Sequence, residues 1–277
     1  MVCVQMIANL SDVVQDALHN HYAVAGVVCL GWEDMRAYAR AAEAEGRPLI
    51  LQAGPGCRKH TPLPILGAMM CHVAASVSVP VVVHLDHSRS IDECRAGLAA
   101  GFTGLMFDGS HLPLLENIAQ TRAVVEMAKG LGIGVEGEIG QVGYAAGAAS
   151  LGTDALEAEL FAQRTGVDAM AVSIGNVHLQ SDSLTLLDED LLQRIEAVTD
   201  VPLVIHGGSG VDPKQRADLG RSSAICKYNI GTELRREFGR ELRLILAEHP
   251  ERFDRNEIFS DLEDRMVEVA RRMLRSL

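Results

Sequence analysis

The chain has 277 residues, with 25 Lys and Arg against 37 Asp and Glu, so its formal net charge is −12. This acidic balance argues against a nucleic-acid binder, because such proteins carry a basic surface that displaces phosphate counterions. A hydrophobic share of 48% and a charged share of 22% exclude the disordered and fibrous classes, and the length fits one large domain or two small ones.

Short apolar, β-branched runs alternate with longer segments of helical period from one end of the chain to the other. We predict eight strands, at residues 23–28, 48–52, 79–85, 104–107, 134–139, 169–174, 202–205 and 224–229. Helices are expected at 32–45, 91–100, 114–131, 154–165, 188–198 and 213–219, with further helices at about 11–19 and from 232 to the end. Helix start signals support two of these, because Asp154 precedes Glu157 by three residues and Asp212 precedes Pro213.

The predicted strands are apolar on both faces, as in VPVVVHL and VPLVIH, which is typical of parallel strands covered by helices. Eight successive β/α units without a linker rich in Pro or Ser predict an α/β fold, the (β/α)8 TIM barrel, with extra terminal helices. We expect one domain over residues 1–277. In this fold the chemistry lies where strands end and the following loops begin, so polar residues there are candidate site residues.

The cysteines and the amino end bear on the cellular compartment. Six cysteines are spread along the chain without a CxxC pair, which indicates reduced thiols. The first twenty residues lack the basic and apolar regions of a secretory signal, and no run of about 18 apolar residues occurs. We therefore expect a cytoplasmic protein without a membrane partner.

Three histidines follow predicted strands at the same rim of the barrel. His87 follows the third strand, His178 the sixth and His206 the seventh. One histidine at such a position is usually an ordinary polar residue, but three that converge form a catalytic zinc arrangement with one position open to water or substrate. His84, three residues before His87, is interpreted as a supporting or structural residue.

Several carboxylates end strands beside these histidines. Asp86 directly precedes His87, and a carboxylate beside a metal can move a proton to or from a substrate hydroxyl. Its alternative role is to orient a histidine. Asp108 and Glu138 end neighbouring strands, and Glu136 lies on the same side of its strand as Glu138. For these three, ion-pairing with barrel lysines and contact with the metal or its ligands both stay open.

Glycine-rich segments follow the last two strands: Gly207, Gly208 and Ser209 after the seventh, and Asn229, Ile230, Gly231 and Thr232 at the end of the eighth. Loops at these positions commonly hold phosphate in this fold, through backbone N–H groups and a helix N-terminus. Glycines also serve tight turns, but the helix that opens at Thr232 favours a phosphate site.

These residues stand in motifs that resemble the class II, zinc-dependent ketose-bisphosphate aldolases, which include fructose- and tagatose-1,6-bisphosphate aldolases. The resemblance runs from about Tyr22 to Glu237. Its motifs, in order, are HLDH at 84–87, GFTGLMFDGSHLPLLENI at 101–118, VEGEIG at 135–140, TGVDAMAVSIGNVH at 165–178, PLVIHGGSG at 202–210 and KYNIGTEL at 227–234.

The resemblance implies a role for each motif residue. It implies that His87, His178 and His206 hold the catalytic zinc, and that Asp86 acts as acid and base on the C4 hydroxyl of the ketose. It implies that Asp108 and Glu138 serve an alternative metal placement. The substrate-binding residues that it implies are Gly207, Gly208, Ser209, Asn229, Ile230, Gly231, Thr232, Leu179 and Arg235. Among them, Asn229 would bond the enediolate, and Arg235 matches a cation for a distal phosphate or is simply a solvated helix residue.

The activity implied by the resemblance is that of a lyase in carbohydrate metabolism, such as glycolysis. It cleaves or forms the C3–C4 bond of a ketose phosphate, with a substrate like fructose or tagatose 1,6-bisphosphate, through a zinc-stabilised dihydroxyacetone phosphate enediolate. The implied cofactor is one zinc ion per subunit, with a monovalent cation as an open second, and the implied assembly is a homodimer or homotetramer. Three alternatives stay open: a relative that acts on a different sugar or sugar phosphate, an aldolase for an unphosphorylated or acid substrate, and a sugar-phosphate-binding barrel with little turnover. Asp86 favours an enzyme over the binding barrel, since simple binding does not need it.

The sequence departs from the family pattern at several positions. Residues 28–30, Val-Cys-Leu, replace a polar Asn-x-Asn stretch, Gly54 replaces a serine, and Leu179 replaces the glycine that follows the second zinc histidine. Ala146 stands where the family has a glutamate on a mobile loop that exchanges a proton with the substrate. We therefore expect a different ketose phosphate, or another proton-transfer group such as Tyr144.

Overall fold

The computed structural model describes residues 7–143, 150–178 and 184–277. Its eight parallel strands pair in chain order, and the eighth pairs with the first to close a barrel. The strands are β1 (Val24–Val28), β2 (Leu49–Ala53), β3 (Val81–Ser88), β4 (Gly104–Phe107), β5 (Gly134–Ile139), β6 (Ala169–Val172), β7 (Leu203–Ile205) and β8 (Ile225–Ile230). The predicted (β/α)8 barrel is confirmed, and each predicted strand is present.

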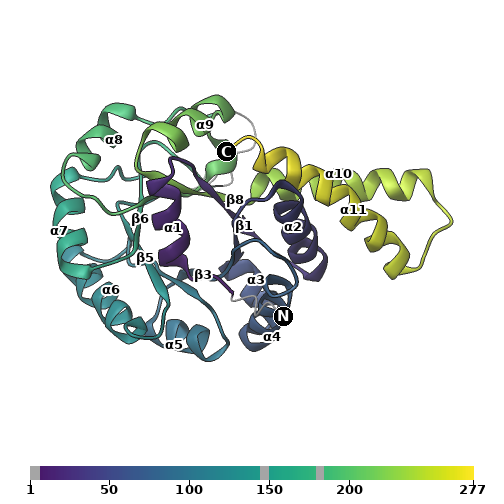
Figure 1. Ribbon diagram of the computed structural model, residues 1–277, viewed down its shortest axis with the longest axis horizontal. Coiled ribbons are helices and arrows are strands. Elements are labelled where there is room, and N and C mark those ends of the chain that lie inside the picture. Colours follow the sequence, from purple (N-terminus) through teal and green to yellow (C-terminus); the bar gives the residue numbers. More distant parts are fainter. Residues whose placement is uncertain (1–6, 144–149, 179–183) are drawn as a thin grey trace.

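Helices surround the barrel (Figure 1). They are α2 (Trp32–Glu45), α3 (Pro55–His60), α4 (Leu63–Ala74), α5 (Ile91–Ala99), α6 (Leu114–Ala128), α7 (Ala155–Thr165), α8 (Glu189–Glu196) and α9 (Pro213–Ser222). A 3₁₀ turn, η1 (Gly208–Gly210), follows β7. The terminal helices are α1 (Leu10–His19), α10 (Thr232–Glu248) and α11 (Arg255–Leu274), and the last two project from the barrel as a hairpin.

Three features of the fold differ from the sequence prediction. The helical segment predicted from Thr232 to the end is two helices, because Pro250 lies in the turn between α10 and α11 and cannot continue a helix. Helices α3 and α4 were not predicted; the prolines there occupy first-turn positions, where their missing N–H groups cost nothing. Strand β3 continues to Ser88 instead of ending at Leu85.

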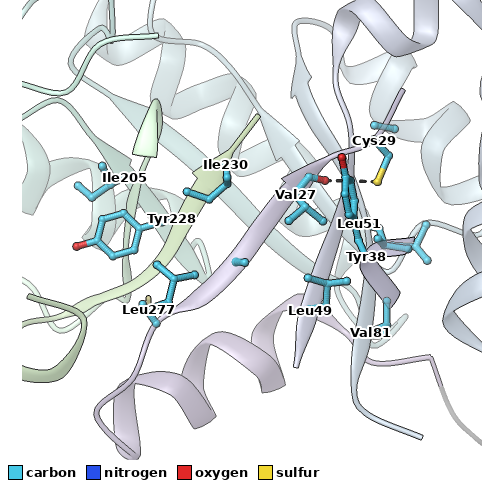
Figure 2. Packing of buried hydrophobic residues seen from close by; sticks show 14 of the residues in the cluster. Val27, Cys29, Tyr38, Leu49, Leu51, Val81, Ile205, Tyr228, Ile230 and Leu277 are labelled. Atoms are coloured by element: carbon cyan, nitrogen blue, oxygen red, sulfur yellow. Dashed lines mark hydrogen bonds between the residues drawn. The ribbon is translucent and has the colours of Figure 1, made fainter. Parts of the chain in front are cut away.

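Apolar side chains pack in two layers, one outside the barrel and one inside it. Figure 2 shows the outer layer, where Leu49, Leu51 and Val81 lie near Tyr38 of α2. Inside the barrel, a second cluster joins Val24, Ile50, Val82 and Val204 to Leu10 and Val14 of α1. Helix α1 therefore closes the barrel at the amino ends of the strands. The candidate site residues lie at the carboxyl ends of the strands. None of the helices in the described part of the chain is long and apolar enough to cross a membrane.

Candidate active site

Three histidines converge at the carboxyl ends of the strands. The ring centroid of His87 lies 4.6 Å from that of His206 and 5.2 Å from that of His178, and the latter two centroids are 5.6 Å apart. Each ring offers a nitrogen within 4.8 Å of those of the other two. The sequence placed these residues on one rim, and the structure brings them together in a group that can hold a metal ion.

A β-bulge directs Asp86 and His87 toward the same site. Leu85 pairs with Leu105 of β4, and Ser88 pairs with Phe107, so Asp86 and His87 together oppose the single residue between them. Successive side chains of a regular strand point to opposite faces. His87 avoids this alternation because its backbone adopts a left-handed conformation with φ of 49°.

Two strand-end carboxylates lie against His87. Its Nδ1 is 3.0 Å from Oδ2 of Asp108 and 3.7 Å from Oε2 of Glu138, and the three residues form a second group that can hold a metal ion. Burial alone lowers the pKa of His87, but the carboxylates of Asp86 and Asp108 outweigh this effect and raise it to about 9. Burial lowers the pKa of His178 to about 3, so that ring is neutral.

Glu136 supports the site from the interior of the barrel. Its carboxylate lies 2.5 Å from Nζ of Lys227 and 3.0 Å from Nε2 of His206, and all three side chains are fully buried. Burial raises the pKa of Glu136, but Lys227 and His206 hold it well below its usual range. Of the two roles left open for the strand-end carboxylates, Glu136 has the ion pair with a barrel lysine. Asp108 and Glu138 instead lie against His87.

Two buried acceptors in this group have no hydrogen-bond partner in the described residues. They are Nδ1 of His206 and Oε2 of Glu138, which lie 3.5 Å apart. Buried polar atoms are normally satisfied, so two such atoms that face each other indicate a missing donor or cation. Together with the imidazoles of His87 and His178, this donor set fits a zinc ion.

Asp86 lies beside the histidines and is buried. Its Oδ1 accepts a hydrogen bond from Nε2 of Gln52 over 2.9 Å and a longer one from Nδ2 of Asn229 over 3.4 Å. Burial raises the pKa of Asp86, but electrostatic attraction to His87, His206 and Lys227 outweighs it and lowers the pKa below its usual value. The carboxylate is therefore ionised and able to accept a proton.

A cavity of about 260 Å³ opens over these groups. Its lining from β3 and from the loops after β6, β7 and β8 includes Asp86, His87, His178, Gly207, Ser209, Asn229, Gly231, Thr232 and Arg235. The end of β1, the loop residues that follow β1 and β2, and the start of α3 contribute Val28, Leu30, Gly54, Pro55, Gly56 and Cys57. Oγ of Ser209 accepts hydrogen bonds from the N–H groups of Gly231 and Glu233, which fixes η1 against the first turn of α10.

Comparison with known proteins identifies the family. Residues 8–277 match the model of the class-II fructose-bisphosphate aldolases. The chain belongs to this family. A fructose-bisphosphate aldolase of Geobacillus stearothermophilus is 32% identical to it over 267 residues, which cover 93% of this chain and 92% of that relative. The chain is therefore an aldolase, and aldolases are lyases.

Solved structures resemble this aldolase over almost its whole length. The YdjI aldolase from Escherichia coli K12 superposes with a TM-score of 0.84 and 30% identity, covering 98% of this chain and 97% of that one. The fructose-bisphosphate aldolase from Campylobacter jejuni has a TM-score of 0.80 and 21% identity, with 100% and 97% covered, and shows the shared fold.

Some predicted site residues of the aldolase lie outside the cavity lining. Ile230 packs its side chain into the outer core, as Figure 2 shows. Gly208 is buried, and its carbonyl accepts a hydrogen bond from Nη1 of Arg216. Arg235 lines the cavity, and its Nε donates to the carbonyl of Gly231 over 3.3 Å. Leu179, Tyr144 and Ala146 lie outside the described residues.

Two residues of the aldolase site were missed by sequence reasoning. Gln52 was predicted only as the end of a strand, although a polar residue after the apolar run LIL at the carboxyl rim is a usable signal. Asn176 ties β6 to β7, because its Nδ2 donates to the carbonyls of Val172 and His206. Asn176 lies shortly after β6 in the GNVH motif, and this position could have predicted that it links the two strand ends.

Proposed function

We propose that this aldolase is a metal-dependent lyase that cleaves or forms the C3–C4 bond of a ketose phosphate, with dihydroxyacetone phosphate as one product. The convergence of His87, His178 and His206 beside the buried carboxylate of Asp86 carries the proposal. The three histidines would hold a zinc ion, and Asp108 and Glu138 would offer it a second position with His87. The family resemblance also implies a monovalent cation as an open second cofactor.

Asp86 performs the proton transfer in this proposal. A zinc ion bound by the histidines would polarise the ketose carbonyl and stabilise negative charge on the three-carbon fragment. Asp86 takes the proton of the C4 hydroxyl, the C3–C4 electron pair passes to the fragment with the carbonyl, and C4 becomes the aldehyde carbon. This fragment must then gain a proton at C3 to become dihydroxyacetone phosphate, and because Ala146 replaces the family's glutamate, that proton comes from solvent or from another side chain. Gln52 and Asn229 support this role because their hydrogen bonds hold the Asp86 carboxylate inside the cavity.

The substrate phosphate would bind where η1 meets α10. Ser209, Gly231 and Thr232 line the cavity at the N-terminus of a 17-residue helix, where backbone N–H groups and the helix dipole favour an anion. Gly207 and Asn229 border the same position, and the guanidinium of Arg235 adds positive charge. Gly208 and Ile230 would contribute through their backbone, since neither presents a side chain to the cavity.

A ketose phosphate other than fructose 1,6-bisphosphate is favoured by the wall from β1 and β2. Val28, Leu30 and Pro55 present apolar surface there, and Gly54 has no side chain. This wall offers few hydrogen-bond partners to a polar aldehyde half. A barrel that only binds a sugar phosphate is less favoured, because binding alone does not need Asp86 ionised and held by two amides.

We further propose a homodimer or homotetramer that works in the cytoplasm on carbohydrates, as in glycolysis. The α10–α11 hairpin supports the assembly, because it projects from the barrel and exposes Leu244, Leu246 and Phe253. The cysteines in the described residues support a cytoplasmic location, since all five are free thiols. The family match over residues 8–277 supports a single aldolase domain over residues 1–277.

A panel of ketose phosphates, assayed for release of dihydroxyacetone phosphate with and without a chelator, tests the proposal. We expect zinc-loaded protein to cleave at least one member and the chelator to stop the reaction. If it cleaves none, the proposed activity is wrong. If fructose 1,6-bisphosphate is the fastest substrate, the aldolase activity stands, but the inference from the apolar wall fails.

A further inference from the structure

Arg58 of α3 bonds to the backbone of the proposed site. Its Nη1 donates to the carbonyl oxygens of Ala53 and Asp86, the latter over 2.5 Å, and its Nη2 donates to the carbonyl of His87 over 3.1 Å. Its Nε donates to Glu93 of α5 over 2.8 Å. The side chain is only 8% exposed, so one guanidinium joins the ends of β2 and β3 to α5.

Two of the three carbonyls that Arg58 binds belong to the bulged residues of β3, Asp86 and His87. Asp86 and His87 together oppose one residue of β4, so the regular ladder is interrupted where the strand reaches the site. His87 also has φ of 49°, a left-handed conformation that is unfavourable for a residue with a side chain. In the bulge, the carbonyls of Asp86 and His87 accept hydrogen bonds from Arg58, and these bonds favour the bulged conformation over a regular strand.

We propose that Arg58 is a positioning residue that holds the β3 bulge and thereby keeps Asp86 and His87 facing the same cavity. The proposal rests on the proposed function, because it assigns His87 to the metal and Asp86 to the proton. In a regular strand, His87 would point away from the site that Asp86 faces. Arg58 therefore acts on both groups through their backbone and touches no reacting atom.

The contacts of Arg58 distinguish this role from substrate binding. Arg58 also borders a neighbouring cavity of about 530 Å³, together with Lys59 and Arg89, where a cation can attract an anionic substrate group. However, Nε, Nη1 and Nη2 all donate to backbone carbonyls or to Glu93. A lysine at this position carries all its donors on one nitrogen and does not reproduce the planar fork that spans these acceptors.

Titration of metal-free protein with Co²⁺ tests the proposal, because the visible absorption of Co²⁺ reports its ligands and their geometry. We expect Arg58→Met to weaken Co²⁺ binding about 10- to 100-fold and to change the absorption spectrum, as loss of groups that orient metal ligands does. We expect kcat to fall much more than KM changes, and Arg58→Lys to recover only part of the affinity. The matched control is Arg95→Met, which removes an exposed arginine of α5 and should leave affinity and spectrum unchanged.

Rescue by a small guanidinium keeps the proposal testable if Arg58→Met folds poorly. The neighbouring cavity borders Arg58, so methylguanidinium can enter the space left in Arg58→Ala. We expect it to restore Co²⁺ affinity, and methylammonium to fail. Wild-type affinity and spectrum in Arg58→Met, or a raised KM with normal kcat, would overturn the positioning role. Failure of the wild type to cleave any ketose phosphate would contradict the proposed function, while the Co²⁺ titration would still measure the effect of Arg58 on the ligands.

Discussion

Nε2 of His206 lies 3.0 Å from Oε1 of Glu136 in the fully buried interior of the barrel. Lys227 pairs with the other oxygen of this carboxylate, so Glu136 stays ionised and can only accept a hydrogen bond. Nε2 of His206 therefore donates a hydrogen bond to Glu136, and its Nδ1, 3.5 Å from Oε2 of Glu138, is the nitrogen that faces the site. The barrel interior thus fixes the tautomer of one proposed zinc ligand.

Lys227→Met should destabilise the protein by about 3–5 kcal/mol, because it leaves the carboxylate of Glu136 buried without its cationic partner. Urea unfolding of the metal-free protein measures this loss. The double variant Lys227→Met/Glu136→Gln should regain much of it, since the unpaired charge is gone. Lys129→Met, which removes an exposed lysine, should cost less than about 1 kcal/mol. A double variant no more stable than Lys227→Met alone would argue against the buried charge as the cause.

Asp86→Asn should lower kcat by about 10²- to 10⁴-fold, because an amide cannot accept the proton of the C4 hydroxyl. Steady-state cleavage of the best ketose phosphate measures the effect. Zinc should still bind at one ion per chain, since the histidines are untouched. Asp92→Asn serves as the control, because that side chain is 90% exposed on α5. Near-normal turnover in Asp86→Asn would assign the proton transfer to another group.

Gly26→Ala should impair catalysis more than stability. A Cβ there would lie 2.5 Å from Oε1 of Gln52 and 2.9 Å from Oδ1 of Asn229, the two amides that hold Asp86. Displacement of a positioned group by about 1 Å can cost roughly 10²-fold in rate, so we expect kcat to fall by about that factor. Gly239→Ala is the matched control, since an added Cβ there has only the flexible side chain of Arg243 nearby. Equal activity in the two variants would mean that Gln52 and Asn229 do not position Asp86.

The buried ring of His84 should make the fold sensitive to acid. Burial lowers its pKa to about 3, so the folded state keeps the ring neutral while the unfolded state binds a proton below about pH 6.5. The contribution of the neutral His84 ring to the free energy of unfolding is fully present above that pH and is lost as the pH falls toward 3. Between pH 7 and pH 4.5 the loss is about 2–3 kcal/mol. Urea unfolding of His84→Gln over this range should show a shallower decline than the wild type; parallel curves would show that His84 does not titrate in this way.

The barrel and the rim of its site were predictable because both depend on patterns of residues that are adjacent in the sequence. Runs such as VPLVIH mark a strand that is buried on both faces, and the polar residues that follow such runs lie on one edge. That logic found His87, His178 and His206, which the structure brings together. It also explains why Asp108 and Glu138 lie near His87 although their strands are separate in the chain.

The supporting contacts were not predictable because they depend on pairs far apart in the chain. Glu136 and Lys227 are 91 residues apart and meet only across the closed barrel. The β3 bulge has no signal in the letters HLDH, and the sequence prediction ended that strand at Leu85. The role of Arg58 depends on this bulge, so it became visible only in the structure.

Release of dihydroxyacetone phosphate, measured while zinc is added back to chelator-treated protein, tests the central claim most directly. The metal-free protein should release none, and the rate should rise with added zinc to a plateau at one ion per chain. His206→Ala should not recover under the same titration. Cleavage that persists without metal and is abolished by borohydride would contradict the account, because it would indicate a lysine Schiff base instead of the histidine site.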